Sequence, residues 1–309
     1  MARLITSASV WTWLVPVCAF RIWYTWQGEC ADNLTHMSLD FSQPFTERTP
    51  RVVNAAKLLR SAGRRKAERF LVEGENAVDA AVSTGSATDL FVTERAAERF
   101  PDIVTAAGYM NVYTHAIDEK AARALTDTVT TTGLFAVCTP VLWSVGKALG
   151  KAPKLVTVPV QTSEPGNAGT LMRVSDAMGA DAVLFAGETV DPQSGKAARA
   201  SAGSLFHVPV ARHADVNDVL GQVRAKGLTI LATAADGEVD LDDADDLLAR
   251  PTAWLFGNEA HGLGEELLAK ADHRVRVPIR GRAESLNLAT AAAICLYESA
   301  RVQSRAKGE

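Results

Sequence analysis

TAWLFGNEAHGLGEELLAKADHRVRVPIRGRAESLNLATAAAICLYESAR, residues 252–301, contains two apolar segments that each run into a polar loop with a glycine. The first segment, TAWLFG, leads to Asn258, Glu259 and His261, and the second, VRVPI, leads to RGRAE. A helix is predicted from Ser285 to about Val302. Loops at the carboxyl ends of strands bind ligands in open α/β sheets. The sequence therefore predicts a ligand site where these two loops lie.

The rest of the chain continues this alternation of strands and helices. From residue 154 onward, strand-like segments such as KLVTVPVQT, DAVLFAG and LTILATAA alternate with helical ones, which is typical of a parallel sheet covered on both faces. The pattern of residues 46–145 predicts a smaller α/β/α domain. Its first elements are a helix over residues 52–61, a basic turn and the strand FLVEG. The segment GKALGKAP, residues 146–153, predicts a linker. The predicted class is α/β, with a second domain over residues 154–309.

Residues 1–45 differ in composition from the rest of the chain, since four of the six tryptophans lie there. Their segment LITSASVWTWLVPVCAF has the size of a signal-peptide core, but it contains Pro16 and is short for a membrane span. A signal or anchor and a structured element are the alternatives. We expect an unstructured or loosely attached extension without membrane attachment, and we consider Met37 an alternative start.

Composition narrows the classes of function. The net charge is −4, so any contact with nucleic acid must be a local basic patch. The four cysteines are scattered without a C-x-x-C pair, which argues against a zinc site or a disulfide framework and fits a reducing cytoplasm. No metal is expected. The segment DPQSGKA lacks the first glycine and the Ser/Thr of a phosphate-binding loop, and no dinucleotide-binding G-x-G-x-x-G follows the first strand.

Three segments fit one site. In TSEPGNAGTLMRVSDAMG, a strand ends before Asn167, which is predicted to open a helix, and Arg173 follows about one and a half turns later. In LFGNEAHG, Glu259 follows a buried strand. In VPIRGRAESLNLATAAA, Ser285 is predicted to cap the last helix and Asn287 to lie in its first turn. Helix capping, a surface arginine and a charge at a helix start are the structural alternatives for these residues.

Together the segments EPGNAGTLMR, LFGNEAHGL and VPIRGRAESLNLATAAAICLYE resemble the three motifs of the SpoU (TrmH) family of SPOUT RNA 2′-O-ribose methyltransferases. Residues 46–145 are similar to the L30e-like RNA-binding domain of the rRNA branch. The sequence departs from the family pattern at Glu164, where Asp is common, and at TTTG, residues 130–133, where Pro-Gln-Gly is usual.

The resemblance implies a fold, a cofactor and a reaction. The loops after the last two strands would form a deep trefoil knot that holds S-adenosylmethionine, with contacts, by match, at Gly257, Val277, Ile279 and Leu286. Arg173 would serve catalysis, and Asn167, Glu259, Ser285 and Asn287 would orient it and the ribose. The implied protein is a cytoplasmic homodimer that methylates ribosomal RNA, most readily 23S rRNA. A tRNA 2′-O-methyltransferase and a non-catalytic RNA-binding or assembly factor are the alternatives.

A basic cluster precedes the first strand of the small domain. Its members are Arg60, Arg64, Arg65, Lys66 and Arg69. A solvated face is the alternative interpretation of such a cluster. Because the chain is acidic and this domain resembles an RNA-binding module, we expect Arg60, Arg64, Arg65 and Lys66 to contact phosphates.

Overall fold

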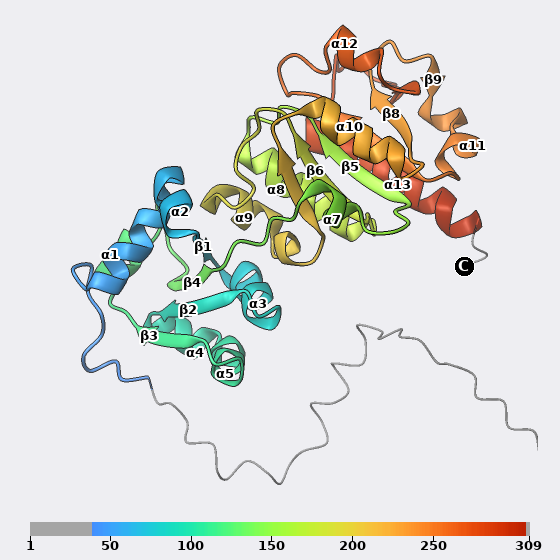
Figure 1. The fold of residues 1–309 in the computed structure, drawn as a ribbon. Coiled ribbons are helices and arrows are strands. Elements are labelled where there is room, and N and C mark those ends of the chain that lie inside the picture. Colours follow the sequence, from blue (N-terminus) through green and yellow to red (C-terminus); the bar gives the residue numbers. More distant parts are fainter. Residues whose placement is uncertain (1–38, 307–309) are drawn as a thin grey trace, which may run out of the picture. The chain divides into compact units, whose positions relative to one another are not determined.

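The computed structural model describes residues 39–306, so residues 1–38 of the extension expected over residues 1–45 lie outside the described part of the chain. The expectation is corrected for its end, because Leu39, Phe41 and Phe45 pack against the cores of the small domain. Figure 1 shows two sheets. The smaller sheet has the order β1-β4-β2-β3, and its strands are β1 (Phe70–Glu73), β2 (Ala87–Val92), β3 (Tyr113–Ala116) and β4 (Leu134–Cys138). Strand β4 is antiparallel to both β1 and β2, whereas β3 is parallel to β2. This sheet is therefore mixed.

Helices pack on both faces of the small sheet. Because successive strand residues point to opposite faces, Phe70 and Val72 pack in one core and Leu71 packs in the other. The first core includes helices α3 (Glu75–Ser83), α4 (Glu94–Arg99) and α5 (Pro101–Tyr109), and the second includes α1 (Pro50–Ala56), the 3-10 helix η4 (Lys57–Leu59) and α6 (Glu119–Ala124). Phe45 also belongs to this domain, since its ring stacks on His115 with centroids 5.2 Å apart.

The larger sheet has seven strands in the order β7-β6-β5-β10-β8-β11-β9, and every neighbouring pair is parallel. They are β5 (Leu155–Pro159), β6 (Ala182–Ala186), β7 (Val210–His213), β8 (Thr229–Thr233), β9 (Val239–Asp240), β10 (Thr252–Phe256) and β11 (His273–Arg276). Strand β11 lies between β8 and β9, which are consecutive in the chain. At their connection a Cβ on Gly237 would lie 2.7 Å from the amide nitrogen of Arg276, so only glycine fits.

Helices cover both faces of the larger sheet as well, which confirms the predicted α/β class. On one face lie α7 (Val145–Leu149), α10 (Val216–Ala225) and α12 (Glu265–Leu268), and on the other lie α8 (Pro165–Ala177), α11 (Asp245–Leu248) and α13 (Leu288–Ala306). Helix α9 (Gly195–Ser201) packs on α8. The buried indole of Trp254 donates to Ser299 Oγ at 2.8 Å and so ties β10 to α13.

Local predictions were wrong at three places. The expected basic turn is helix α2 (Ser61–Ala67), and the last helix begins at Leu288 rather than at Ser285. The expected linker, residues 146–153, is in part helix α7, whose Val145, Ala148 and Leu149 are buried against the larger sheet. The second domain therefore begins before residue 154, at helix α7.

Among residues 39–306, no helix combines the length and the apolar character that crossing a membrane requires. The same residues include no cluster of His, Cys, Asp and Glu that could hold a metal ion.

Candidate active site

Glu259 links the loop after β10 to the start of helix α8. One carboxylate oxygen accepts hydrogen bonds from the amide and hydroxyl of Ser163, at 3.2 and 3.0 Å. The other accepts from the amide of Glu164 at 3.1 Å and from Asn167 Nδ2 at 3.0 Å. Burial opposes ionisation of Glu259, but the hydrogen bonds from Asn167 and from the backbone amides outweigh it and hold the pKa below its ordinary value. Glu259 is therefore a charged acceptor that gathers the first two motifs.

Asn167 stands between the second and the third motif. Its Nδ2 donates to Glu259, and its Oδ1 accepts from Asn287 Nδ2 at 3.2 Å. Since Glu259 can only accept, this chain of bonds fixes which way the Asn167 amide points. Asn167 lies in the first turn of α8 but does not cap it, because Glu164 Oε1 accepts from the amide of Gly166 and is the N-cap.

Asn287 takes the capping role that was predicted for Ser285. Its Oδ1 accepts from the amides of Ala289 and Thr290, at 2.9 and 3.3 Å, which is the geometry of an N-cap. The same side chain thus starts α13 and reaches Asn167. Ser285 is exposed and forms no hydrogen bond with another described residue. The structure brings Glu259, Asn167 and Asn287 together and leaves Ser285 outside this group.

Arg173 lies farther along the same helix as Asn167. It is exposed, and its side chain has no ion pair or hydrogen bond with another residue of 39–306. A guanidinium stays charged at any physiological pH and offers several donors in one plane. The Arg173 side chain is therefore available to an anionic ligand. Because both residues belong to α8, the Cα of Arg173 keeps a fixed position relative to Asn167.

The strand ends fit the predicted cofactor. Gly257 follows β10, and a Cβ on it would lie 2.2 Å from the carbonyl carbon of Gly262, so the loop folds back on the strand end. The segment after β11 presents aliphatic side chains to solvent, with Ile279 39% and Leu286 37% exposed, while Val277 packs partly in the core. The closely packed main chain at Gly257 and the exposed aliphatic side chains after β11 suit a ligand that has an apolar, planar part. The predicted contacts of Gly257, Val277, Ile279 and Leu286 with S-adenosylmethionine are compatible with this arrangement and stay a prediction.

Sequence analysis did not single out Ser163 and Lys196 as parts of this site. Lys196, at the start of α9, donates to Glu164 at 2.6 Å. That bond, together with the amide of Gly166, holds the pKa of the Glu164 carboxyl below its ordinary value. The departure at Glu164 from the usual Asp thus retains a capping carboxylate. No pattern in the sequence could have paired Lys196 with Glu164, because the pairing arises from the packing of α9 on α8.

One of the predicted RNA contacts is not available. Arg64 is 8% exposed, donates to the carbonyl oxygens of Leu58 and Leu59, and forms an ion pair with Asp191 at 2.7 Å. A buried guanidinium whose donors are engaged cannot reach a phosphate, so the prediction for Arg64 is corrected. Three other predicted contacts, Arg60, Arg65 and Lys66, are exposed.

Comparison with known proteins fits this geometry. The profile of the SpoU rRNA Methylase family matches residues 154–297, and that described as RNA 2′-O ribose methyltransferase substrate binding matches residues 71–143. The chain is 33% identical over 243 residues, 78% of its length, to the Bacillus subtilis 23S rRNA (guanosine(2553)-2′-O)-methyltransferase, of which it covers 92%.

Two further relatives match in different ways. The Escherichia coli tRNA (guanosine(18)-2′-O)-methyltransferase is 35% identical over 159 residues, which are 50% of this chain and 67% of that protein. The structure of an AdoMet-bound rRNA methyltransferase from Sinorhizobium meliloti superposes with a TM-score of 0.72 at 28% identity, over 84% of this chain and 97% of that one. The chain belongs to the SpoU family, and it is an RNA 2′-O-ribose methyltransferase that depends on S-adenosylmethionine.

Proposed function

We propose that the substrate is ribosomal RNA, and 23S rRNA in particular. Similarity to the 23S rRNA enzyme extends over both domains, whereas similarity to the tRNA enzyme covers half of the chain. A substrate-binding domain precedes the methyltransferase domain. Because ribosomal RNA is the proposed substrate, we place the reaction in the cytoplasm.

The observation that carries the proposed assignment of site residues is the chain of hydrogen bonds from Glu259 through Asn167 to Asn287. It joins three segments that lie far apart in the sequence, and all three follow parallel strands of the same sheet, β5, β10 and β11. Polar side chains that fix one another in this way stay oriented when a ligand binds, which lowers the cost of reaching the transition state. We assign Asn167, Glu259 and Asn287 to orienting the ribose and Arg173.

S-adenosylmethionine, when bound, supplies an electrophilic methyl group for a ribose 2′-hydroxyl. That hydroxyl is a weak nucleophile that releases its proton to water as its oxygen takes the methyl group, so negative charge that develops on the oxygen must be stabilised. We assign this role to Arg173, which also holds a neighbouring phosphate with its planar donors. A guanidinium offers donors and no acceptor, which makes proton removal by Arg173 a poor alternative. Ser285, exposed beside Asn287, is assigned to contact with the RNA.

We also propose a homodimer that uses the outer face of α13. On this helix Ala292, Cys295 and Leu296 are fully buried in the core of their own domain. The opposite side carries Ile294, 36% exposed, and Tyr297, 55% exposed. A helix that is apolar on both sides needs a second partner. In such a dimer Arg173 of one protomer would serve the cofactor held by its partner.

The experiment is methyl transfer from labelled S-adenosylmethionine to transcripts of 23S rRNA and of tRNA. We expect the label in 23S rRNA, at a position that resists alkaline cleavage because a methylated 2′-oxygen cannot attack the adjacent phosphate. Transfer to tRNA alone would contradict the proposed substrate and would leave the class of reaction standing.

A further inference from the structure

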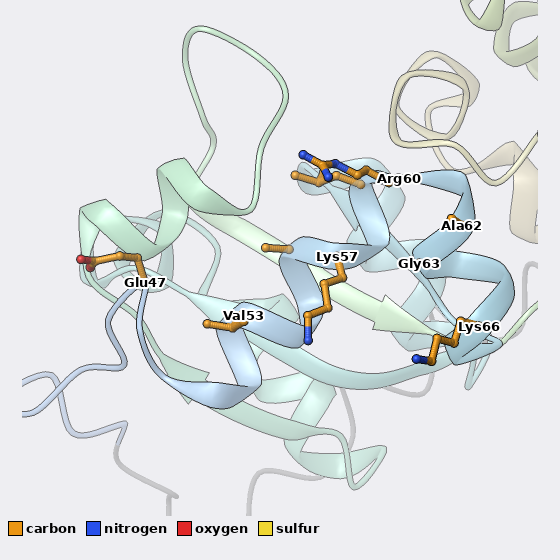
Figure 2. A pocket seen from close by; sticks show the side chains of 9 residues that line it. Glu47, Val53, Lys57, Arg60, Ala62, Gly63 and Lys66 are labelled. Carbon is orange, nitrogen blue, oxygen red and sulfur yellow. The ribbon is translucent and has the colours of Figure 1, made fainter.

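The first helices of the small domain border a hollow of about 640 Å³ that is open to solvent. Figure 2 shows it between α1, η4 and α2. It is lined by Glu47, Val53, Ala56, Lys57, Leu59, Arg60, Ala62, Gly63 and Lys66. All of these residues precede residues 71–143, which match the substrate-binding profile. The hollow thus lies outside the part of the domain to which that profile assigns RNA binding.

The floor of the hollow is apolar, although it faces solvent. Helix α1 packs its residues Val52 and Ala55 into the core, while Val53, 38% exposed, and Ala56 face the hollow. At the other side, a Cβ on Gly63 would lie 2.0 Å from the carbonyl oxygen of Lys57. This contact brings α2 against η4 and sets the shape of the floor. Ala56 and Leu59 are only partly buried against the core, and together with the exposed Val53 they leave an apolar floor uncovered. Such a floor suits a ligand with an apolar face.

The rim of the hollow is basic. Residues 50–69 contain seven Lys or Arg and one Glu, a net charge of +6 in a chain whose net charge is −4. Arg64 is neutralised by Asp191 and Arg51 by Asp89. Lys57, Arg60 and Lys66 line the hollow, and they have no ion pair with any residue between 39 and 306. These three cations are therefore available to an anion.

These three cations lie around the apolar floor. In Figure 2 the side chains of Lys57 and Lys66 extend from η4 and α2 into the space between the helices, and Arg60 lies at the turn that joins them. Charges at the rim and an apolar floor between them suit a planar base whose neighbouring phosphates stay at the surface. Duplex RNA offers phosphates but no free base face.

We propose that this hollow binds one unstacked nucleotide of single-stranded RNA, with its base on the floor of Val53, Ala56 and Leu59 and its phosphates at Lys57, Arg60 and Lys66. The proposal rests on RNA being the substrate. It adds a second contact, away from the methyltransferase site, that recognises a single-stranded segment of that RNA. The floor contains no aromatic side chain, so the contribution of the base lies at the low end of what stacking contributes, about fivefold in affinity.

The test separates the base from the phosphates. Binding of hexaadenylate to the full chain is measured against an abasic hexamer of the same length, over a range of salt concentrations. Lys57→Gln with Lys66→Gln should lower the slope of log affinity against log salt by about 1.4, since each phosphate contact in a single strand contributes about 0.7. The preference for hexaadenylate over the abasic hexamer should remain in this variant.

Val53→Ser makes the floor polar without changing charge, and it should abolish that preference while the salt slope stays unchanged. Lys120→Gln is the control, because Lys120 is an exposed cation of the same domain that does not line the hollow. Equal binding of the two hexamers to the unmodified protein would overturn the proposal, since it would show an electrostatic patch only. Unchanged binding by both variants would also overturn it.

Methyl transfer to 23S rRNA by the unmodified protein is measured in parallel. Its absence would contradict the proposed substrate and not the hollow. If methyl transfer is present but hexamer binding is unchanged in Val53→Ser and in Lys57→Gln with Lys66→Gln, the proposed nucleotide site in the hollow is contradicted and the proposed substrate is not.

Discussion

Replacing Glu259 with Gln should disable the site while leaving the fold intact. The carboxylate accepts four hydrogen bonds, two on each oxygen, from Ser163, Glu164 and Asn167. A glutamine has one amide oxygen, so one of the two acceptor oxygens is replaced by an NH₂ group that faces donors, and two of the four hydrogen bonds are lost. Each hydrogen bond lost is worth about 0.5–1.5 kcal/mol, or about 1–3 kcal/mol in all.

This loss is expected to lower turnover and to lower stability by no more than the same amount, so the fold stays intact. The four bonds hold the loops of the site, and Glu259 itself is exposed at the surface. A penalty of about 1–3 kcal/mol on the geometry of the transition state lowers kcat about 5- to 150-fold. The assay is single-turnover methyl transfer to 23S rRNA, with thermal unfolding measured beside it. Glu265→Gln is the matched control, since it removes the same charge from an exposed position whose side chain has no hydrogen bond partner among residues 39–306.

The pH dependence follows from the lowered pKa of Glu259. A carboxyl whose pKa is lower in the folded protein stabilises the fold at every pH above its unfolded value, about 4.3, and this stabilisation is lost as the pH falls through the folded value. We therefore expect no contribution of Glu259 to the pH profile between about pH 6 and 8. Full kcat in Glu259→Gln would refute the assigned role.

Three further outcomes are expected. Gly257→Ala should weaken S-adenosylmethionine binding about tenfold or more by calorimetry, because its Cβ would meet Gly262 at 2.2 Å; unchanged affinity would remove Gly257 from the cofactor site. Ile294→Arg should shift the sedimentation coefficient to that of a monomer and reduce methyl transfer, because Ile294 lies on the exposed face of α13. Ala292→Arg should instead unfold the domain, because Ala292 is fully buried. An unmodified protein that is active as a monomer would contradict the proposed dimer. A chain that begins at Met37 should keep its melting temperature and activity, and loss of either would overturn the expectation of a loosely attached extension.

The order of strands and helices was largely predictable because hydrophobic period and length identify buried strands. The failures have physical causes. SAGRRKA reads as a turn because Gly63 lowers helix propensity, but the close contact with Lys57 requires glycine inside helix α2. The composition of residues 146–153 indicates a linker, but burial of Ala148 and Leu149 stabilises helix α7. Tertiary packing overrides local preference in both cases.

The site was predictable in its membership and less so in its contacts. The resemblance to the three family motifs singled out Asn167, Glu259 and Asn287, which the structure joins by hydrogen bonds. Capping preference alone does not decide between Ser285 and Asn287, since Ser and Asn are nearly equal N-caps. The choice of Asn287 depends on its second hydrogen bond to Asn167, which only the folded chain provides. The burial of Arg64 depends likewise on Asp191, 127 residues away in the sequence.

Arg173→Ala provides the most direct test of the central claim, that this site transfers a methyl group to a ribose of ribosomal RNA through Arg173. Methyl transfer to 23S rRNA and calorimetric binding of S-adenosylmethionine are measured on the same preparations. We expect the unmodified protein to produce alkali-resistant dinucleotides and Arg173→Ala to produce none. The affinity of Arg173→Ala for the cofactor should stay within a few-fold of that of the unmodified protein. Arg173→Lys should be nearly inactive, because the point charge of an ammonium does not replace the planar donors of a guanidinium. Full activity in Arg173→Ala, or an equal loss of cofactor binding and turnover, would contradict the claim.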